Sequence, residues 1–174
     1  QKRQDLGLDK PIVAQYFDYL GNLARFDLGD SMVYEQRVSK PIIEKLPATL
    51  ELIIVGMGLT ILIGIPLGAF AASKRRTGGD MGIRLYGIIV FCIPVYWMGL
   101  MLQLIFGIWL GWLPVAGRTG ARVFASTFDK TGFYVIDTIM AGNWTAFLDV
   151  VHHLALPSLT LGIVLSGVFV RMTR

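Results

Sequence analysis

Two long stretches without a charged side chain constrain this 174-residue sequence more than any other feature. Residues 52–72 and residues 85–117 contain no Asp, Glu, Lys, Arg or His. An α-helix needs roughly 20 apolar residues to cross a hydrocarbon core about 30 Å thick, so each stretch can span a bilayer. A third apolar stretch, residues 154–170, ends at Arg171. The sequence therefore predicts an all-α integral membrane protein with about three spans, near residues 48–72, 84–110 and 154–171.

The distribution of basic residues predicts how these spans are oriented. The short loop of residues 73–84 contains Lys74, Arg75, Arg76 and Arg84 but a single acid, Asp80. Basic loops between spans stay in the cytoplasm, so this loop is expected on the inner side. Residues 1–45 then form an extracytoplasmic segment, residues 46–174 the transmembrane region, and residues 113–153 an outer loop. We expect a multi-pass protein of the cell membrane. The net charge of +4 is attributed to basic residues whose placement sets the topology, and no nucleic-acid partner is expected.

Both outer segments contain an amphipathic pattern. In the first, Asp9 and Pro11 indicate a helix start, and the chain is expected to leave the helix near Gly29. Its apolar positions recur at helical spacing: Ile12, Val13, Tyr16, Phe17, Leu20 and Leu23. In the second, Asn143 or Thr145 is a plausible cap for an apolar face that reaches Leu154. Pro157 is expected to precede or kink the third span.

Small residues recur at every fourth position of the first span. They are Gly56, Thr60, Gly64, Gly68 and Ala72. Membrane helices associate by close packing, because lipid is as apolar as leucine, and small side chains let two backbones approach. This stripe predicts a helix-packing seam.

Prolines inside the two long spans predict kinks or hinges. Pro66 and Pro94 each remove a backbone donor and disrupt the bond to the preceding turn. Tyr96 and Trp97 follow the second proline, and Gln103 is the only amide inside a span. An intramembrane polar side chain faces protein or a water-filled cavity. Pro94, Tyr96, Trp97 and Gln103 are therefore candidates for a pathway or gate, and packing of aromatic rings or an interhelical hydrogen bond is the alternative.

The residue patterns expected of an enzyme are missing from the sequence. The phosphate-binding pattern G-x-x-x-x-G-K-[ST] does not occur, so ATP hydrolysis is expected on a separate subunit. His152 and His153 lack metal-ligand spacing. Thr60 and Ser166 have no His or acid at comparable depth, which argues against an intramembrane hydrolase. No catalytic, cofactor-binding or metal-binding residue is predicted.

An ordered series of motifs resembles one transporter family over nearly the whole length. The motifs are Leu6-Gly7-Leu8-Asp9-Lys10-Pro11, Asp27-Leu28-Gly29-Asp30-Ser31, Lys45-Leu46-Pro47-Ala48-Thr49-Leu50-Glu51-Leu52, Gly64-Ile65-Pro66-Leu67-Gly68, Ile93-Pro94-Val95-Tyr96-Trp97, Gly111-Trp112-Leu113-Pro114 and Leu156-Pro157-Ser158-Leu159-Thr160-Leu161-Gly162. The chain resembles the membrane subunits of the dipeptide, oligopeptide and nickel branch of ABC importers. It departs at Val95-Tyr96, where the family often has Ser-Phe.

This resemblance implies a type I ABC importer fold and a channel-forming subunit that is not itself an enzyme. The chain would correspond to the second to fourth of about six spans, with the first and last spans missing. Arg171 and Arg174 would then lie near the region that couples to the ATPase. Implied partners are a second permease, two ATP-binding subunits that hold ATP and Mg, an extracytoplasmic substrate-binding protein, and the lipid membrane.

The resemblance also suggests the cargo. Peptides are the first choice, and the alternatives are the same importer class carrying nickel or oligosaccharide, or a membrane protein that binds partners without transport.

Overall fold

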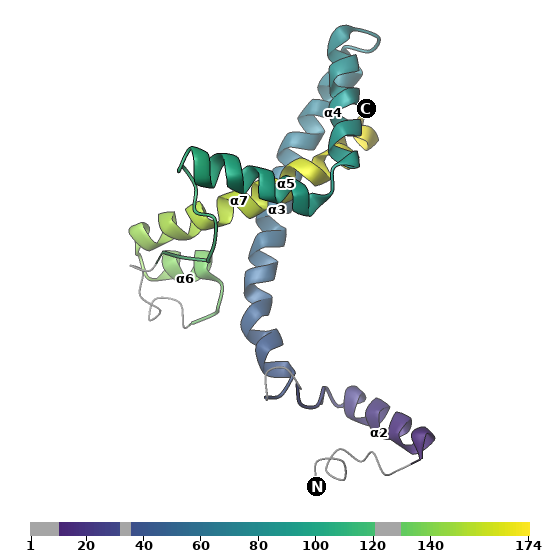
Figure 1. The fold of residues 1–174 in the computed structure, drawn as a ribbon, viewed down its shortest axis with the longest axis vertical. Coiled ribbons are helices and arrows are strands. Elements are labelled where there is room, and N and C mark those ends of the chain that lie inside the picture. The colour runs from purple at the N-terminus through teal and green to yellow at the C-terminus, as the bar shows by residue number, and fades with distance from the viewer. Residues whose placement is uncertain (1–10, 32–35, 121–129) are drawn as a thin grey trace. The chain divides into compact units, whose positions relative to one another are not determined.

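The computed structural model describes residues 11–31, 36–120 and 130–174, and it is built from α-helices (Figure 1). Within these ranges no strand forms, and one isolated backbone bridge joins Asp30 to Arg37. The predicted all-α class is confirmed. The chain divides into two compact units, residues 1–46 and residues 47–174.

The first unit contains helix α2 (Ile12–Ala24), which follows Pro11. The predicted start at Asp9 and Lys10 lies outside the described residues. The helix ends earlier than the expected stop near Gly29, because Phe26 adopts a left-handed conformation (φ 60°). The amide of Asp27 bonds the Asn22 carbonyl at 2.9 Å and that of Phe26 bonds the Leu23 carbonyl at 3.0 Å. This is a Schellman cap with phenylalanine in the usual place of glycine.

Six further elements follow within the described ranges. They are α3 (Ser39–Ser73), α4 (Gly78–Cys92), α5 (Val95–Leu102), the π-helix η1 (Gln103–Trp109), α6 (Tyr134–Met140) and α7 (Trp144–Thr173). Helices α3 and α7 are each long and apolar enough to cross a membrane. Helix α4 together with α5 and η1 makes a third crossing if the pair is one broken span.

The second apolar stretch is broken at Pro94, as the sequence predicts. Helix α4 ends with Ile93 in an extended conformation, and Pro94 caps α5. The two helices meet at 102°. A residue that precedes proline disfavours the helical conformation, and the proline has no N–H to offer the preceding turn. Pro66, in contrast, lies inside α3 without ending it.

Helix α7 is longer than the predicted third span. The Asn143 side chain accepts a hydrogen bond from the Ala146 amide at 3.1 Å, so the expected cap is correct. The amphipathic stretch and the span are one continuous helix, however, with Pro157 inside it. The hydroxyl of Ser158 donates to the Leu154 carbonyl beside the proline. Hydroxyl groups and neighbouring helices let membrane helices tolerate an internal proline.

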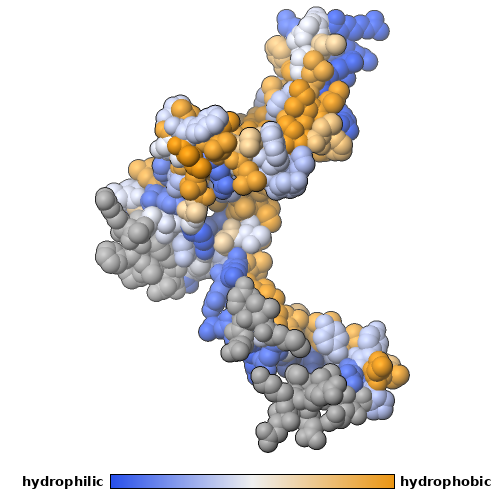
Figure 2. Space-filling model, in the orientation of Figure 1, coloured by the Kyte–Doolittle hydropathy of each residue, from blue (hydrophilic) through white to orange (hydrophobic). Residues whose placement is uncertain are grey.

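The second unit is organised around α7 (Figure 1). Helix α3 runs parallel to it, because a Cβ added at Gly56, Gly64 or Gly68 would meet Leu161, Phe169 and Thr173 in turn. Helix α4 runs antiparallel, since Asp80 binds Arg174 while Tyr86 bonds Ser166 at 2.7 Å. Figure 2 shows hydrophobic surface along α3 and α4, and hydrophilic surface at the turn that joins them.

The predicted seam is the contact surface between α3 and α7. Gly56, Thr60, Gly64 and Gly68 are all buried in the structure. A Cβ at Gly64 would lie 2.6 Å from the Phe169 Cβ, so only glycine fits there. Ala72 is exposed, and Ala71 takes the buried position at the end of the stripe.

Replacing Gly64 with alanine is expected to weaken the α3–α7 contact. Overpacking a tight contact costs about 1–3 kcal/mol, so Gly64→Ala should lower the thermal stability of the full-length protein in detergent. Gly58→Ala is the matched control, because a Cβ at Gly58 meets nothing within 4 Å and alanine favours the helix. Equal stability of the two variants would contradict the seam.

Candidate functional site: a cavity beside the broken helix

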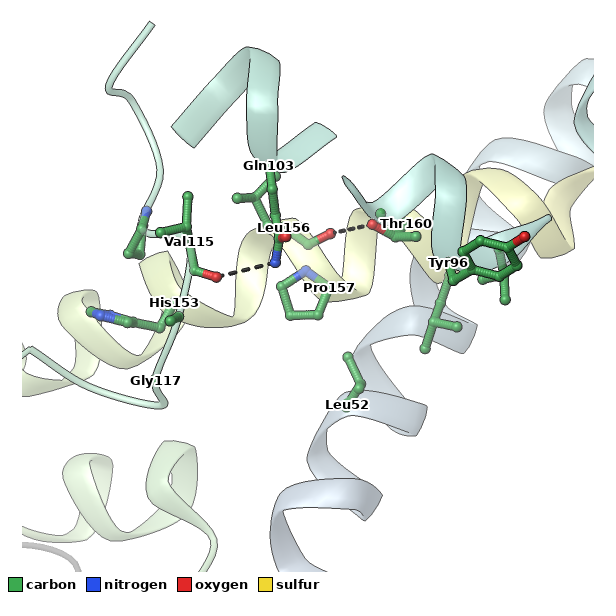
Figure 3. A pocket seen from close by; sticks show the side chains of 14 residues that line it. Leu52, Tyr96, Gln103, Val115, Gly117, His153, Leu156, Pro157 and Thr160 are labelled. Atoms are coloured by element: carbon green, nitrogen blue, oxygen red, sulfur yellow. Dashed lines mark hydrogen bonds between the residues drawn. The ribbon is translucent and has the colours of Figure 1, made fainter. Parts of the chain in front are cut away.

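A cavity of about 450 Å³ lies where α3, α5, η1 and α7 meet the loop of residues 114–117 (Figure 3). The break at Pro94 shapes its walls, because it turns α5 across α7, where Gly99 faces Thr160. The central cavity is lined by Leu52, Val95, Tyr96, Gly99, Gln103, Pro114, Val115, Ala116, Gly117, His153, Leu156, Pro157, Thr160 and Leu161.

Gln103 is the central polar side chain of this cavity. It belongs to the π-helix η1, and in Figure 3 it reaches from that helix between Val115 and Leu156. Its Nε2 donates to the Val115 carbonyl at 3.1 Å. This bond ties the loop of residues 114–117 to η1, and π-helical turns occur frequently at functional sites. The amide is held in the cavity wall by this backbone contact, and a ligand carbonyl can replace its acceptor.

Two further polar side chains of the cavity, Thr160 and His153, are bonded within their own helix. The hydroxyl of Thr160 donates to the Leu156 carbonyl at 2.9 Å. The Nδ1 of His153 lies 2.8 Å from the Asp149 carbonyl and 3.6 Å from the Asp149 carboxylate. No Asp, Glu, Lys or Arg is among the lining residues. Such a wall suits hydrogen bonds to uncharged groups and apolar contact.

The structure separates the four candidate gate residues. Tyr96 and Gln103 both line the central cavity, with Tyr96 and His153 at opposite ends of it (Figure 3). Pro94 stands at the start of α5 and makes the bend. Trp97 is about half exposed and does not line the cavity.

A second cavity, of about 260 Å³, adjoins the first and contains an ion pair that sequence reasoning missed. The two cavities share Leu52, Gly117, His153 and Pro157. Glu51, which is 7% exposed, accepts a hydrogen bond from Arg118 at 2.7 Å. Its other oxygen accepts the Val135 amide at 2.7 Å, and the Arg118 guanidinium lies 3.6 Å from the centre of the Tyr134 ring.

This ion pair fastens the loop after η1 to α3. Arg118 also donates to the Gly132 carbonyl at 3.2 Å, and Asp137 accepts the amides of Thr131 and Gly132. Glu51 therefore binds both Arg118 and the Val135 amide at the start of α6. The sequence feature that could have indicated this ion pair is Glu51 itself. It is a lone acid that directly precedes an uncharged stretch of 21 residues from Leu52 to Ala72.

The opposite end of the helices carries another buried acid. Asp80, 2% exposed, accepts hydrogen bonds from Arg174 at 2.6 and 2.9 Å and lies 3.6 Å from Arg84. Arg171 lies over the Phe91 ring at 5.1 Å. The sequence placed Arg171 and Arg174 at one end of the chain's last helix but did not predict the pairing with Asp80.

The described part of the chain contains no assembled metal site. There, no three His, Cys, Asp or Glu side chains come together as a metal site would require. His152 lies 2.7 Å from the Trp112 carbonyl, and His153 bonds Asp149. The two imidazoles are held by different backbone groups.

The described helices surround a ligand-sized cavity beside the bend between α4 and α5, and two of them are long and apolar enough to cross a membrane. Residues 64–174 match the family of binding-protein-dependent transport system inner membrane components. The chain belongs to this family, whose members are inner-membrane components of transport systems.

The relatives of this chain include three peptide permeases. The chain is 40% identical over 97% of its length to the di/tripeptide transport system permease protein of Pseudomonas aeruginosa, covering 50% of that protein. It is 37% identical over 98% of its length to the dipeptide permease of Escherichia coli K12, again covering 50%. The Salmonella typhimurium peptide permease SapB is 33% identical over 90% of this chain, which covers 49% of it. The chain thus spans about half the length of the curated relatives it matches.

Removing the Arg118 charge should loosen the segment that contains α6. Arg118→Met leaves the Glu51 carboxylate buried without its cation, and a hydrogen bond to a charged group contributes about 1.5–3 kcal/mol. Hydrogen exchange at the Val135 amide is expected to accelerate about tenfold or more. The control is Lys130→Met, which removes an exposed cation nearby. Unchanged exchange in Arg118→Met would mean that the ion pair does not hold this segment.

Proposed function

We propose that this chain forms part of the translocation pathway of an ATP-driven peptide importer, and that the central cavity lies on that pathway. The observation that carries the proposal is a ligand-sized, uncharged cavity at the proline break of a membrane helix, in a member of a transport family. The names of the relatives, which are peptide, dipeptide and di/tripeptide permeases, favour peptides as cargo.

The chemistry of the cavity fits a peptide. Peptides of different sequence share amide groups and differ in side chains, so a permissive pathway needs hydrogen bonds to the backbone and few fixed charges. Gln103 supplies an amide, Thr160 a hydroxyl, and Leu52 and Leu156 an apolar wall. Tyr96 stands at one end as the proposed gate, with Pro94 as its hinge.

The proposed orientation puts the Asp80 end in the cytoplasm and the Glu51 end outside. The basic residues beside Asp80 support it. The helix directions also support it. Three consecutive spans must alternate in direction, and α3 runs parallel to α7 while α4 runs antiparallel to it. In this arrangement Arg171 and Arg174 lie at the cytoplasmic end, near the proposed coupling region.

The complete importer would contain further subunits. We propose a second permease, two ATP-binding subunits that hold ATP and Mg, and an extracytoplasmic substrate-binding protein. ATP must favour one arrangement of the helices over another, because a ligand that binds both equally shifts nothing. This chain would supply the pathway, and the hydrolysis would take place on the partners.

Cysteine accessibility tests whether the cavity is part of an aqueous pathway. In a full-length permease with Cys92→Ala, Gln103→Cys should react with a membrane-impermeant maleimide, because position 103 lines the cavity. Leu100→Cys is the control: it lies on the same broken segment, is about half exposed and is not among the cavity residues. Reaction at position 100 and none at 103 would contradict the pathway.

Peptide uptake tests the function itself. Cells that lack the full-length gene should take up labelled di- and oligopeptides poorly, and re-expression with its neighbouring genes should restore uptake. Maleimide treatment should then inhibit uptake in the Gln103→Cys strain and spare the Leu100→Cys strain. Restoration of nickel or oligosaccharide uptake, with peptides unaffected, would replace the proposed cargo.

A further inference from the structure

A groove of about 220 Å³ lies between α4 and α7, and it shares no lining residue with the central cavity. Gly87 and Gly167 line it where the two helices face each other. A Cβ at Gly167 would lie 3.4 Å from the Gly87 carbonyl oxygen. Tyr86 and Ser166 hydrogen-bond beside the crossing at 2.7 Å. Beyond the glycines the helices continue to the Asp80 end, and the groove lies between them.

Three arginines surround the groove, and one carboxylate opposes them. Arg84, Arg171 and Arg174 are all lining residues. Asp80 is occupied by Arg174, which donates two hydrogen bonds to it, and lies farther from Arg84, at 3.6 Å. The Arg84 side chain is 52% exposed, and Arg171 rests over an aromatic ring. The cluster therefore keeps about two units of positive charge at the mouth of the groove, which attracts an anion.

The remaining walls of the groove are apolar. Ile83, Ile88 and Val170 line it, and Ile88 and Phe91 are exposed hydrophobic residues of α4. In a membrane protein such a surface faces hydrocarbon. A ligand that matches both the positively charged mouth and the apolar walls needs a phosphate-like anion next to a hydrocarbon chain. A free polar anion would leave the apolar walls uncovered.

We propose that this groove binds one anionic phospholipid, with its headgroup phosphate held by Arg84 and Arg171. Guanidinium groups bind phosphate through paired, charge-assisted hydrogen bonds. The acyl chains lie along Ile88 and Phe91, and Arg174 remains on Asp80 as the fixed wall. Basic pockets between membrane helices at the cytoplasmic surface bind anionic headgroups. The site adds a lipid ligand to a chain whose proposed cargo passes elsewhere, and it requires no transport.

The test is lipid retention by the full-length permease. The protein is purified in mild detergent from vesicles that contain phosphatidylglycerol, cardiolipin and phosphatidylethanolamine, and bound lipid is quantified by mass spectrometry. The wild type is expected to retain anionic lipid over the zwitterionic lipid. Each of Arg84→Gln and Arg171→Gln is expected to lower retention about fivefold, since one basic residue near the surface contributes about that factor.

The matched control is Arg75→Gln, which removes the same charge from the same basic loop but outside the groove. Retention that falls equally in all three variants would show a general surface-charge effect and overturn the site. Retention that does not fall in Arg84→Gln or Arg171→Gln would also overturn it, because another segment of the full-length chain would then fill the groove. An excess of inorganic phosphate that releases the lipid from the wild type would mark a free-phosphate site instead.

A second variant keeps the test decisive if an arginine variant does not fold. Ile88→Trp fills the groove and leaves every charge in place. It should lower retention of anionic lipid as strongly as Arg171→Gln, and normal retention would contradict the proposal. Peptide uptake is measured on the same strains, so loss of lipid binding is distinguished from loss of transport.

Discussion

The close contact between α3 and α7 is the interaction on which the rest of the second unit depends. In lipid the hydrophobic effect does not drive two helices together, so the contact depends on close van der Waals packing. Gly64 and Gly68 leave space for Phe169 and Thr173, and Gly162 leaves space for Leu59 in return. Because both helices contribute small residues, the contact is fixed in rotation and in register. Helix α7 can then receive α4 and α5 on its other faces, and the central cavity lies where those faces meet.

Two buried acids mark the two ends of this packed core. Glu51 binds Arg118 and the Val135 amide, and Asp80 binds Arg174. A buried charge is costly unless it is paired, so each acid fixes a specific partner from a distant part of the chain. The Glu51 pair closes the loop over one end of the cavities. The Asp80 pair joins α4 to α7 and leaves Arg84 and Arg171 beside the groove between these two helices.

The local features of this fold could be predicted from the sequence, whereas its long-range pairs could not. The spacing of Gly56, Thr60, Gly64 and Gly68 identified one buried stripe, proline chemistry predicted the break at Pro94, and Asn143 was a recognisable cap. The sequence left open whether Pro157 precedes or kinks the third span, and it did not predict that the amphipathic stretch and the span form one helix; neighbouring helices can hold the backbone through an internal proline. Ala71 and Ala72 could not be told apart, since a helix of 3.6 residues per turn drifts from a strict fourfold spacing. For the cavity, sequence pointed to Gln103 and Tyr96 but not to His153 or Thr160, which only the fold brings beside them.

Paired cysteines test the parallel α3–α7 register most directly. The test uses a full-length permease with Cys92→Ala and two cysteine pairs, one at each end of the seam. One pair is Gly56→Cys with Leu161→Cys, and the other is Gly68→Cys with Thr173→Cys. The Cβ atoms within each pair are in contact range. Mild oxidation should cross-link both pairs and leave the exchanged combinations, Gly56→Cys with Thr173→Cys and Gly68→Cys with Leu161→Cys, unlinked. Cross-linking of the exchanged combinations alone would mean that α3 and α7 run antiparallel, and the account of the core, the cavity and the groove would fail with it.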